Sequence, residues 1–451
     1  MIGWGDSKKP ALILGADQLS FGELESRVAA REGELRREGP GSDISIRELR
    51  AVMRFETIIE FLACLRAGTP VALFSPDGTA FEVDSRRKLL VSAAHPAAAV
   101  ILFTSGSTAE PKAVQLSLEN IEANVQAVVS SLGFGTVSEQ TLFLPLSYCF
   151  GMLGQLLPAL ASGVTTRLVP RFADLRELLE NGSARGMWSG VPSHWEAILK
   201  LCRRVDPSAI GIERVVSAGA RLGTDLKHRL KNAFPRAILH NNYGCTEASP
   251  RILSLSSAHP RFFDEGVGLP VGDWEIGLGA EGELLVRGRQ TMLGYLGDAE
   301  GTKRKIRPGG WLDTGDAATI SEDGFVAILG RRDEVYNVGG ERIGAAEVLA
   351  AFEGLKLAGR LGVAEAALLV EEDPLYGARV AAFVVLEKRD PTRDSSAPTR
   401  AELVAALGER LGSHKVPREY YSVDSLPRTP NGKISREGLK ALKSLGLLLR
   451  S

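Results

Sequence analysis

The first two thirds of the chain alternate short apolar runs with amphipathic stretches. In the amphipathic stretches, apolar residues recur every three or four positions, which is the spacing of a helix packed on one face. The apolar runs predict strands at 71–74, 98–103, 166–169, 214–217 and 237–239, and the amphipathic stretches predict helices at 119–132, 175–180, 192–202 and 224–234. Strands that alternate with helices form largely parallel sheets covered by helices. This part of the chain is therefore predicted to be a layered α/β fold.

The pattern changes near residue 267. Short strands with Gly-rich turns are found at 282–287, 317–320 and 325–329, which predicts a β-rich subdomain. A charged break comes next, and a helix, a strand and another helix are then predicted at 345–352, 380–386 and 400–411, enough for a small α+β domain of about 120 residues. We therefore predict an N-terminal domain over residues 1–331 and a C-terminal domain over residues 332–451. The polar segment 388–399 is expected to be a surface loop.

Composition narrows the class of protein. The chain has 451 residues, 44% of them hydrophobic and 24% charged, as expected for a globular protein with a full core. Its net charge of −1 provides no overall field to attract nucleic acid, and no uncharged apolar run is long enough to span a bilayer. The four cysteines are dispersed and the six histidines lack the spacing of zinc ligands. We expect a cytoplasmic protein with no nucleic-acid partner and no membrane span.

The segment at 102–112, which reads LFTSGSTAEPK, carries the clearest chemistry. It places four hydroxyl groups, a glycine and a lysine directly after a predicted strand. Backbone N–H groups, hydroxyl donors and a cation in one turn are what a polyphosphate needs. The segment is not the common P-loop, because Pro111 stands where that motif has a glycine. A Ser/Thr-rich turn is by itself most often a solvated loop, so the assignment depends on motifs further along the chain.

Five such motifs occur in a fixed order: NYGCTE at 242–247, GELLVRG at 282–288, GWLDTGD at 310–316, GRRD at 330–333 and LPRTPNGKI at 426–434. With the first loop, they make the chain resemble the adenylate-forming superfamily of acyl-CoA synthetases, luciferases and peptide-synthetase adenylation domains, in its acid:CoA ligase-like branch. The resemblance spans nearly the whole chain. It implies a large N-terminal domain and a small mobile C-terminal domain that hold ATP and a carboxylic acid between them.

The resemblance also implies roles for individual residues toward ATP and Mg²⁺. The phosphate loop is matched by Thr104, Ser105, Gly106, Ser107, Thr108 and Lys112. The adenine site is matched by Asn242, Tyr243 and Gly244, with the tyrosine ring stacked on the base. Thr246 and Glu247 match the catalytic Thr-Glu pair, with Glu247 as the Mg²⁺ ligand. Asp316 matches the carboxylate that accepts both ribose hydroxyls, and Arg331 matches a second contact to ribose or phosphate.

Two residues carry the roles that the resemblance gives to the C-terminal domain. Lys433 matches the catalytic lysine that bridges the carboxylate and the α-phosphate, and Asp333 matches the hinge. The acyl site is matched by small and polar residues at strand ends and by one aromatic residue: Tyr148, Ser189, Gly190, Val191, Gly219, Ala220 and Asn241. Small residues at strand ends also serve tight packing, so this last set has two interpretations.

Departures from the family pattern bear on the substrate. Tyr148 stands where acyl-CoA synthetases often have a histidine, and Phe150 lies near the position where amino-acid-activating relatives place an aspartate. Because a phenylalanine supplies no counter-charge to an ammonium group, an α-amino acid is disfavoured. The segment 337–341 resembles the version found in aryl-acid-activating members. Ala109 and Ala113 replace glycines of the phosphate loop, which is therefore expected to be stiffer or differently shaped.

The sequence thus favours an ATP-dependent, AMP-forming ligase that activates a small or aryl carboxylic acid and transfers it to a thiol, with ATP, Mg²⁺ and CoA as cofactors. A second hypothesis keeps the adenylation and changes the acceptor to a carrier-protein phosphopantetheine or an amine. A third, based on the two alanines and on a segment at 76–98 shorter than that of longer relatives, is a non-catalytic nucleotide-binding protein.

Overall fold

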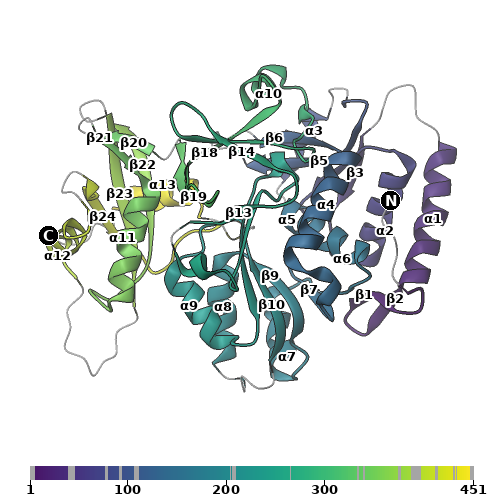
Figure 1. Ribbon diagram of the computed structural model, residues 1–451, viewed down its shortest axis with the longest axis horizontal. Coiled ribbons are helices and arrows are strands. Elements are labelled where there is room, and N and C mark those ends of the chain that lie inside the picture. The colour runs from purple at the N-terminus through teal and green to yellow at the C-terminus, as the bar shows by residue number, and fades with distance from the viewer. Residues whose placement is uncertain are drawn as a thin grey trace.

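The structure is a computed structural model that describes residues 6–38, 46–76, 80–90, 94–105, 111–203, 205, 210–264, 266–332, 335–338, 341–373, 377–387, 398–411, 415–429, 432 and 434–446. It is a mixed α/β structure with a large N-terminal part and a smaller C-terminal part (Figure 1). The N-terminal helices lie at one end of the long axis and the C-terminal elements lie at the other.

A nine-stranded sheet forms the centre of the large part. Its strands, in spatial order, are β13 (Leu269–Pro270), β12 (Leu253–Ser256), β11 (Ile238–Tyr243), β10 (Gly211–Ser217), β9 (Arg185–Gly190), β7 (Glu139–Leu142), β8 (Thr165–Leu168), β1 (Pro10–Leu14) and β2 (Asp17–Ser20). The strands from β11 to β1 are parallel, whereas β2, β12 and β13 at the two edges are antiparallel to their neighbours. A parallel sheet brings the carboxyl ends of its strands to one edge, which matters for the site.

A second sheet has five strands: β16 (Gly294–Tyr295), β6 (Pro111–Ser117), β5 (Ala98–Ser105), β4 (Val71–Phe74) and β3 (Arg47–Arg50). The antiparallel pair β5–β6 flanks the predicted phosphate loop and places Thr104 opposite Lys112. Ala113 pairs with Phe103 in the same ladder and is 1% exposed. Because a regular strand position requires no positive φ, an alanine replaces a glycine there without backbone strain.

Helices cover the sheets on both sides. One face of the nine-stranded sheet packs on helices that share a core with Trp188 and Leu239: α7 (Leu175–Glu180), α8 (Pro192–Cys202) and α9 (Thr224–Ala233). Between the two sheets lie α4 (Leu118–Leu132), α5 (Cys149–Gly151), a π-helical turn (Met152–Leu156) and α6 (Leu157–Ala161). The remaining helices of this part are α1 (Phe21–Glu38), α2 (Phe55–Ala67) and α3 (Ala80–Leu89).

A third sheet forms the predicted β-rich subdomain. Its strands are β14 (Glu275–Leu278), β15 (Glu283–Arg287), β18 (Trp311–Ile320), β17 (Ile306–Arg307) and β19 (Val326–Arg331), and α10 (Ala299–Lys305) precedes β17. The sequence pattern predicted only the last four residues of β18, 317–320. The part of the strand before them carries Asp313, Thr314 and Asp316, whose polar side chains break the apolar alternation but are buried and bonded within the fold.

The C-terminal part has its own core. It contains β20 (Val335–Val338), β21 (Glu341–Gly344), β22 (Val363–Asp373), β23 (Gly377–Leu386) and β24 (Glu419–Ser422), with α11 (Ala345–Leu357), α12 (Arg400–Gly408) and α13 (Arg436–Ser444). Phe352, Leu355, Ala382, Leu407 and Tyr420 pack together inside it. A separate core is what allows two parts of a chain to move as units.

The main elements predicted from the pattern are confirmed. Strand 71–74 coincides with β4, and helices 175–180 and 192–202 coincide with α7 and α8. The helix predicted at 400–411 ends earlier, at Gly408. Most of the predicted loop 388–399 lies outside the described residues. Within the described ranges, no helix combines the length and the apolar character needed to cross a bilayer.

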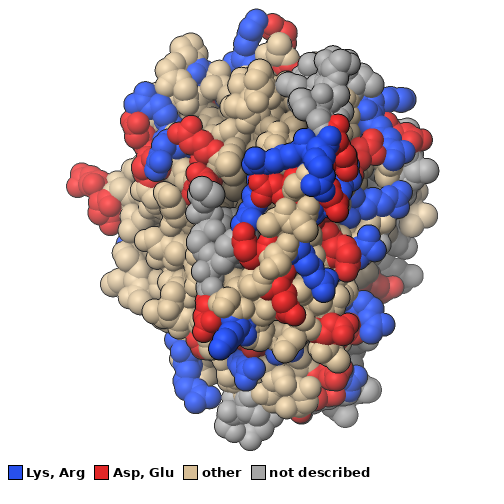
Figure 2. Space-filling view, turned by 90° about the vertical axis from the view of Figure 1, so that its right-hand side faces the viewer, with Lys and Arg blue, Asp and Glu red and all other residues tan. Residues whose placement is uncertain are grey.

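Positive and negative side chains are interleaved on the face formed by the N-terminal helices (Figure 2). Arg31 contacts Glu34 and Glu60, and Arg66 contacts Glu25, across and along α1 and α2. Ion pairs at a solvent-accessible surface contribute little stability each. Their mixed signs give this face no single-sign patch.

Candidate active site

Three neighbouring strands of the large sheet end at the same edge. β9, β10 and β11 are parallel and adjacent, so the segments after them lie side by side. Of the predicted acyl-site residues, Gly190 ends β9 and Val191 follows it, whereas Gly219 and Ala220 come after β10. The segment 244–247 comes after β11. Gly219 has φ of +83°, and a Cβ there would lie 2.6 Å from the hydroxyl oxygen of Tyr148. The structure therefore brings the predicted acyl-site and nucleotide-site segments together.

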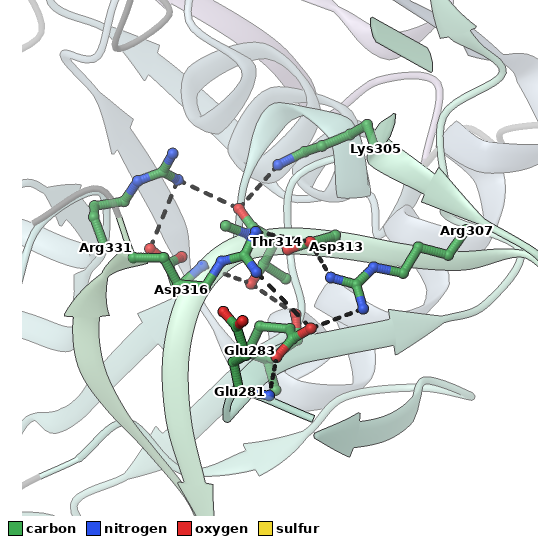
Figure 3. Close-up of polar contacts among 11 residues, drawn as sticks. Glu281, Glu283, Lys305, Arg307, Asp313, Thr314, Asp316 and Arg331 are labelled. Atoms are coloured by element: carbon green, nitrogen blue, oxygen red, sulfur yellow. Dashed lines mark hydrogen bonds and ion pairs between the residues drawn. The ribbon is translucent and has the colours of Figure 1, made fainter. Parts of the chain in front are cut away.

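The predicted adenine and ribose residues are in direct contact. The hydroxyl of Tyr243 donates a hydrogen bond to the Asp316 carboxylate. Arg331 Nη1 lies 3.6 Å from Asp316 Oδ1 (Figure 3). Burial and the Asp316 charge raise the pKa of Tyr243 well above its usual range. Gly244 is required by close approach, because a Cβ there would lie 1.7 Å from the carbonyl oxygen of Pro250. Asp316 is 8% exposed and thus forms a pre-oriented acceptor.

An ion-pair network lies beside this carboxylate (Figure 3). Arg307 contacts Glu283 at 2.8 Å and Asp313 at 2.6 Å, and Arg332 contacts Asp313 at 3.0 Å. Backbone N–H donors and the Arg307 guanidinium lower the pKa of Glu283 to about 2. Because Arg332 directly precedes the predicted hinge residue Asp333, the network anchors the N-terminal side of that position.

The predicted Mg²⁺ ligand Glu247 and the loop lysine Lys112 meet at one tyrosine. Tyr295 donates a 2.7 Å hydrogen bond from its hydroxyl to Glu247 Oε1, and the Lys112 ammonium lies 4.7 Å from the centre of the same ring. Burial, together with the neighbouring Glu247 charge, raises the pKa of Tyr295 far above its usual value, so this hydroxyl remains a donor. The tyrosine therefore orients the carboxylate and supports the cation.

The remaining predicted residues on this edge are small, buried or bonded. Thr246 Oγ1 lies 3.3 Å from Cys149 Sγ, which ties the Thr-Glu pair to α5. Ser189 donates a 2.7 Å hydrogen bond to Gln155 Oε1. The Asn241 amide donates to the carbonyl oxygen of Gly266 at 3.3 Å, on the sheet face opposite to that of its neighbour Asn242.

The C-terminal part contacts the same edge. Ser193 Oγ donates a 3.1 Å hydrogen bond to the carbonyl oxygen of Gly432, and a Cβ on Gly432 would lie 2.7 Å from Val191. Three ion pairs add to this contact: Arg221–Glu353 at 2.6 Å, Lys356–Asp225 at 3.4 Å and Lys356–Glu196 at 3.6 Å. The backbone next to residue 433 is thus held against the end of β9.

Several predicted residues lie outside the described part of the chain: Gly106, Ser107, Thr108, Asp333 and Lys433. The backbone of Ser105 ends β5, whereas its side chain is not among those described. Their roles stay predictions. Thr104 and Lys112 are described, and they bracket the loop at the base of the β5–β6 pair.

Sequence reasoning missed Tyr295, Cys149 and Ser193. Tyr295 stands seven residues after the GELLVRG motif, and its position after a glycine at the end of an apolar run gave no sign of a partner 48 positions away. Ser193 stands two residues after the predicted acyl-site residue Val191, but its partner is in the other part of the chain. Such long-range partners are visible only once the fold is known.

The donor set fits a magnesium ion shared with a nucleotide. Among the described residues, no group of three or more histidine, cysteine, aspartate or glutamate side chains is placed to hold a metal by itself. Mg²⁺ is commonly held by one or two carboxylates together with substrate phosphates and water. Glu247 supplies one such carboxylate, with one oxygen already oriented by Tyr295.

Two segments of the chain match known protein-family models. Residues 88–296 match the model for AMP-binding enzymes, and residues 357–433 match the C-terminal domain of AMP-binding enzymes. Feruloyl-CoA synthase from Amycolatopsis sp is 30% identical over 347 residues, which cover 74% of this chain and 68% of the relative. 4-Coumarate-CoA ligase 2 from Narcissus pseudonarcissus is 30% identical over 363 residues, covering 75% of this chain.

A propanoyl:CoA ligase acting on a methyl-dioxo-octahydroindenyl acid, from Rhodococcus jostii, is 29% identical over 76% of this chain. The chain spans 65% of the length of that relative and 61% of the 4-coumarate-CoA ligase. Among solved structures, ATP-bound MatB from Rhodopseudomonas palustris superposes with a TM-score of 0.83 at 22% identity, covering 98% of this chain and 97% of that one. MenE from Bacillus subtilis, in complex with its acyl-adenylate intermediate, superposes with a TM-score of 0.78 at 24% identity. The match covers 96% of this chain and 95% of that one.

The two solved structures establish the fold, and the feruloyl-CoA synthase match covers more than two thirds of that relative at 30% identity. The two family-model matches cover the regions that contribute the strand ends and the docked C-terminal segment described above. The chain therefore belongs to the family of AMP-binding enzymes.

Proposed function

We propose that this protein is an ATP-dependent, AMP-forming acid–thiol ligase that converts a carboxylic acid to an acyl-adenylate and transfers the acyl group to CoA. The observation that carries the proposal is the convergence at one sheet edge of the Asp316 carboxylate, the Glu247 carboxylate and the Gly432 backbone. The relatives named as CoA ligases support the choice of CoA as acceptor.

In the first half-reaction, a carboxylate oxygen attacks the α-phosphorus of ATP, the new C–O–P linkage forms, and the bond to pyrophosphate breaks. The difficulty is charge, because an anion approaches a polyanion. In this proposal Lys433 bridges the carboxylate and the α-phosphate, Lys112 and the loop hydroxyls hold the outer phosphates, and Glu247 holds Mg²⁺. When bound, Mg²⁺ supplies charge neutralisation to the phosphates.

Asp316 and Tyr243 hold the nucleoside in this proposal. The Asp316 carboxylate accepts both ribose hydroxyls, and the Tyr243 ring provides a flat apolar platform for adenine. The hydroxyl of Tyr243 already orients that carboxylate. Arg331, 3.6 Å from Asp316, adds positive charge beside the ribose and phosphates.

In the second half-reaction the thiol sulfur attacks the acyl carbon, the thioester C–S bond forms, and AMP leaves while the thiol proton passes to solvent. We place the boundary between domains at residues 331 and 332 and the hinge at Asp333. The C-terminal domain then rotates after adenylation, which withdraws Lys433 and admits the thiol. The anchored Arg332 supports a fixed N-terminal side of this hinge.

The test is acid-dependent pyrophosphate release with a panel of carboxylic acids. Lys433→Ala should abolish adenylation while leaving thioester formation from a pre-made acyl-adenylate largely intact. Lys440→Ala, an exposed lysine on α13, is the matched control and should leave both steps unchanged. Equal loss of both half-reactions in Lys433→Ala, or no acid-dependent release by the wild type, contradicts the proposal.

The acceptor is tested separately, with free CoA, a phosphopantetheinylated carrier protein and a simple amine offered to the same adenylate. Thioester formation with CoA is expected. The non-catalytic alternative loses part of its basis, because Ala113 occupies a regular strand position. ATP binding without turnover on any acid would restore that alternative.

A further inference from the structure

Arg251 is a buried cation that the described residues leave largely unpaired. It lies five residues after Thr246 and is 2% exposed. Its backbone is fixed, because its N–H donates to Asn124 Oδ1 at 3.2 Å and its carbonyl accepts from Trp274 Nε1 at 2.7 Å. Its Nε and Nη2 have no hydrogen-bond partner within the described part of the chain, and no aspartate or glutamate is among the groups that shift its pKa. A buried charge left unpaired is costly unless something else supplies the partner.

The surroundings of Arg251 belong to the candidate acyl site. Its Cζ lies 5.1 Å from the centre of the Phe150 ring, and a Cβ on Gly154 would lie 3.7 Å from its Nη2. Phe150 in turn contacts Tyr148, with ring centres 6.1 Å apart, and the Tyr148 hydroxyl lies over Gly219. A continuous set of contacts therefore runs from the small residues at the strand ends to the guanidinium.

Neutral polar groups without partners lie on the same side of the sheet. His240 and Asn242 are 4% and 3% exposed, and both ring nitrogens and both amide atoms lack partners within the described residues. They are two positions apart on β11, so their side chains point to one face. Ser189 lies in register with Val216, which lies in register with His240, so Ser189 shares this face. Its partner Gln155 has an amide nitrogen that is also unpartnered among these residues.

The charge of Arg251 also affects its neighbours. Burial and the nearby Arg251 and Arg214 charges lower the pKa of His240, with burial as the largest cause, to about 4. The histidine is therefore a neutral donor and acceptor at pH 7. Of Arg251, His240, Asn242, Ser189 and Gln155, only the arginine carries a charge, so this cluster is suited to an anion and unsuited to a cation.

We propose that Arg251 is the counter-ion for a second carboxylate of the acid substrate, with His240 and Asn242 as neutral hydrogen-bonding partners. The substrate is then a dicarboxylic acid, whose reactive carboxylate lies near Gly190 and Gly219 and whose other carboxylate lies past Tyr148. The planar guanidinium matches a carboxylate in two parallel hydrogen bonds. A hydrocarbon end would leave the cation unpaired, and an ammonium would be repelled.

This inference rests on the proposed function and is tested with matched acids. ATP–pyrophosphate exchange is measured with pairs of equal chain length, butyrate with succinate and cinnamate with 4-carboxycinnamate. For at least one pair the wild type should have a KM at least tenfold lower for the dicarboxylic acid. Arg251→Met, which keeps the apolar length and removes the charge, should raise the dicarboxylate KM about tenfold or more and leave the monocarboxylate KM unchanged or lower. Arg289→Met is the control, because that exposed arginine pairs with Asp273.

A second variant tests the same inference in case Arg251→Met does not fold. Phe150→Asp places a carboxylate beside Arg251 and should abolish the preference for dicarboxylic acids by occupying the guanidinium. Equal KM values for both acids of every pair in the wild type, or an equal loss for both acids in Arg251→Met, overturns this inference while exchange itself supports the proposed function. The absence of exchange with every acid instead overturns the proposed function.

Discussion

Ser193 Oγ donates a 3.1 Å hydrogen bond to the carbonyl oxygen of Gly432, a residue 239 positions further along the chain. This contact joins the start of α8, just beyond the end of β9, to the segment that leads into Lys433. Arg428 also donates to the Gly432 carbonyl, at 3.0 Å, so two donors fix one oxygen. The segment before the predicted catalytic lysine is therefore held at the site by the N-terminal part of the chain.

We expect Ser193→Ala to slow adenylation two- to tenfold and to leave thioester formation from a pre-made adenylate unchanged. The range corresponds to the loss of one hydrogen bond of about 0.5–1.5 kcal/mol. Single-turnover measurement of each half-reaction checks it. Ser193→Thr keeps the hydroxyl and should behave as the wild type. An equal effect of Ser193→Ala on both half-reactions would show that the contact does not belong to the adenylation conformation.

Tyr295→Phe removes the hydroxyl that orients Glu247 and keeps the ring beneath Lys112. Loss of a group that orients a metal ligand typically weakens metal affinity about 10–100-fold. We therefore expect the Mg²⁺ concentration that gives half-maximal pyrophosphate exchange to rise about tenfold or more. Tyr421→Phe is the matched control, because that hydroxyl donates to Glu419 at 3.0 Å in the C-terminal part. An unchanged Mg²⁺ dependence in Tyr295→Phe would remove Glu247 from the metal site.

Whether the sequence could predict an interaction depends on how far apart its two partners lie along the chain. The strand β5, the helix α8 and the order of the motifs could be predicted, because periodicity and turn residues are local features. The burial of polar residues could not be predicted from such local features. Asp313 breaks the apolar alternation of β18 and is tolerated because Arg307 and Arg332 neutralise it from other positions.

Arg251 shows the same limit at the site. In the sequence it is one arginine between Pro250 and Ile252, and its burial depends on packing against Phe150, which comes about a hundred residues earlier. The only local sign is a charged residue at the start of an apolar run. Ala113 is the opposite case. An alanine is unexpected at this position of the motif, but its regular strand pairing explains it.

Asp316→Asn should weaken ATP binding about ten- to hundredfold, since it removes a charged acceptor whose hydrogen bonds are each worth about 1.5–3 kcal/mol. An amide offers one acceptor oxygen in place of two, so the variant should also lose discrimination against 2′-deoxy-ATP and 3′-deoxy-ATP. Calorimetric titration with the three nucleotides measures both effects. Asp323→Asn, an exposed aspartate paired with Arg261, is the control. Retained discrimination in Asp316→Asn would place the ribose elsewhere.

Two histidines should make the fold less stable in mild acid. Burial is the main cause that lowers the pKa of His240 and of His194 to about 4, and the Arg428 charge adds to the effect on His194. An unfolded histidine has a pKa of about 6.5, so between these values the unfolded state binds more protons. Stability then rises with pH in this interval and is lost as the pH falls from about 6.5 toward 4.

The interval from pH 7 to pH 5 separates this effect from that of Glu283. The pKa of Glu283 is lowered to about 2, so its contribution to stability is lost only below pH 4.5. Urea unfolding should give a lower free energy of unfolding at pH 5 than at pH 7. His240 should account for about 2 kcal/mol of the difference, and the part-exposed His194 for less. His240→Gln and His194→Gln should each reduce that loss, and the double variant should remove most of it. A double variant that keeps the full wild-type loss would mean that other groups carry the pH dependence.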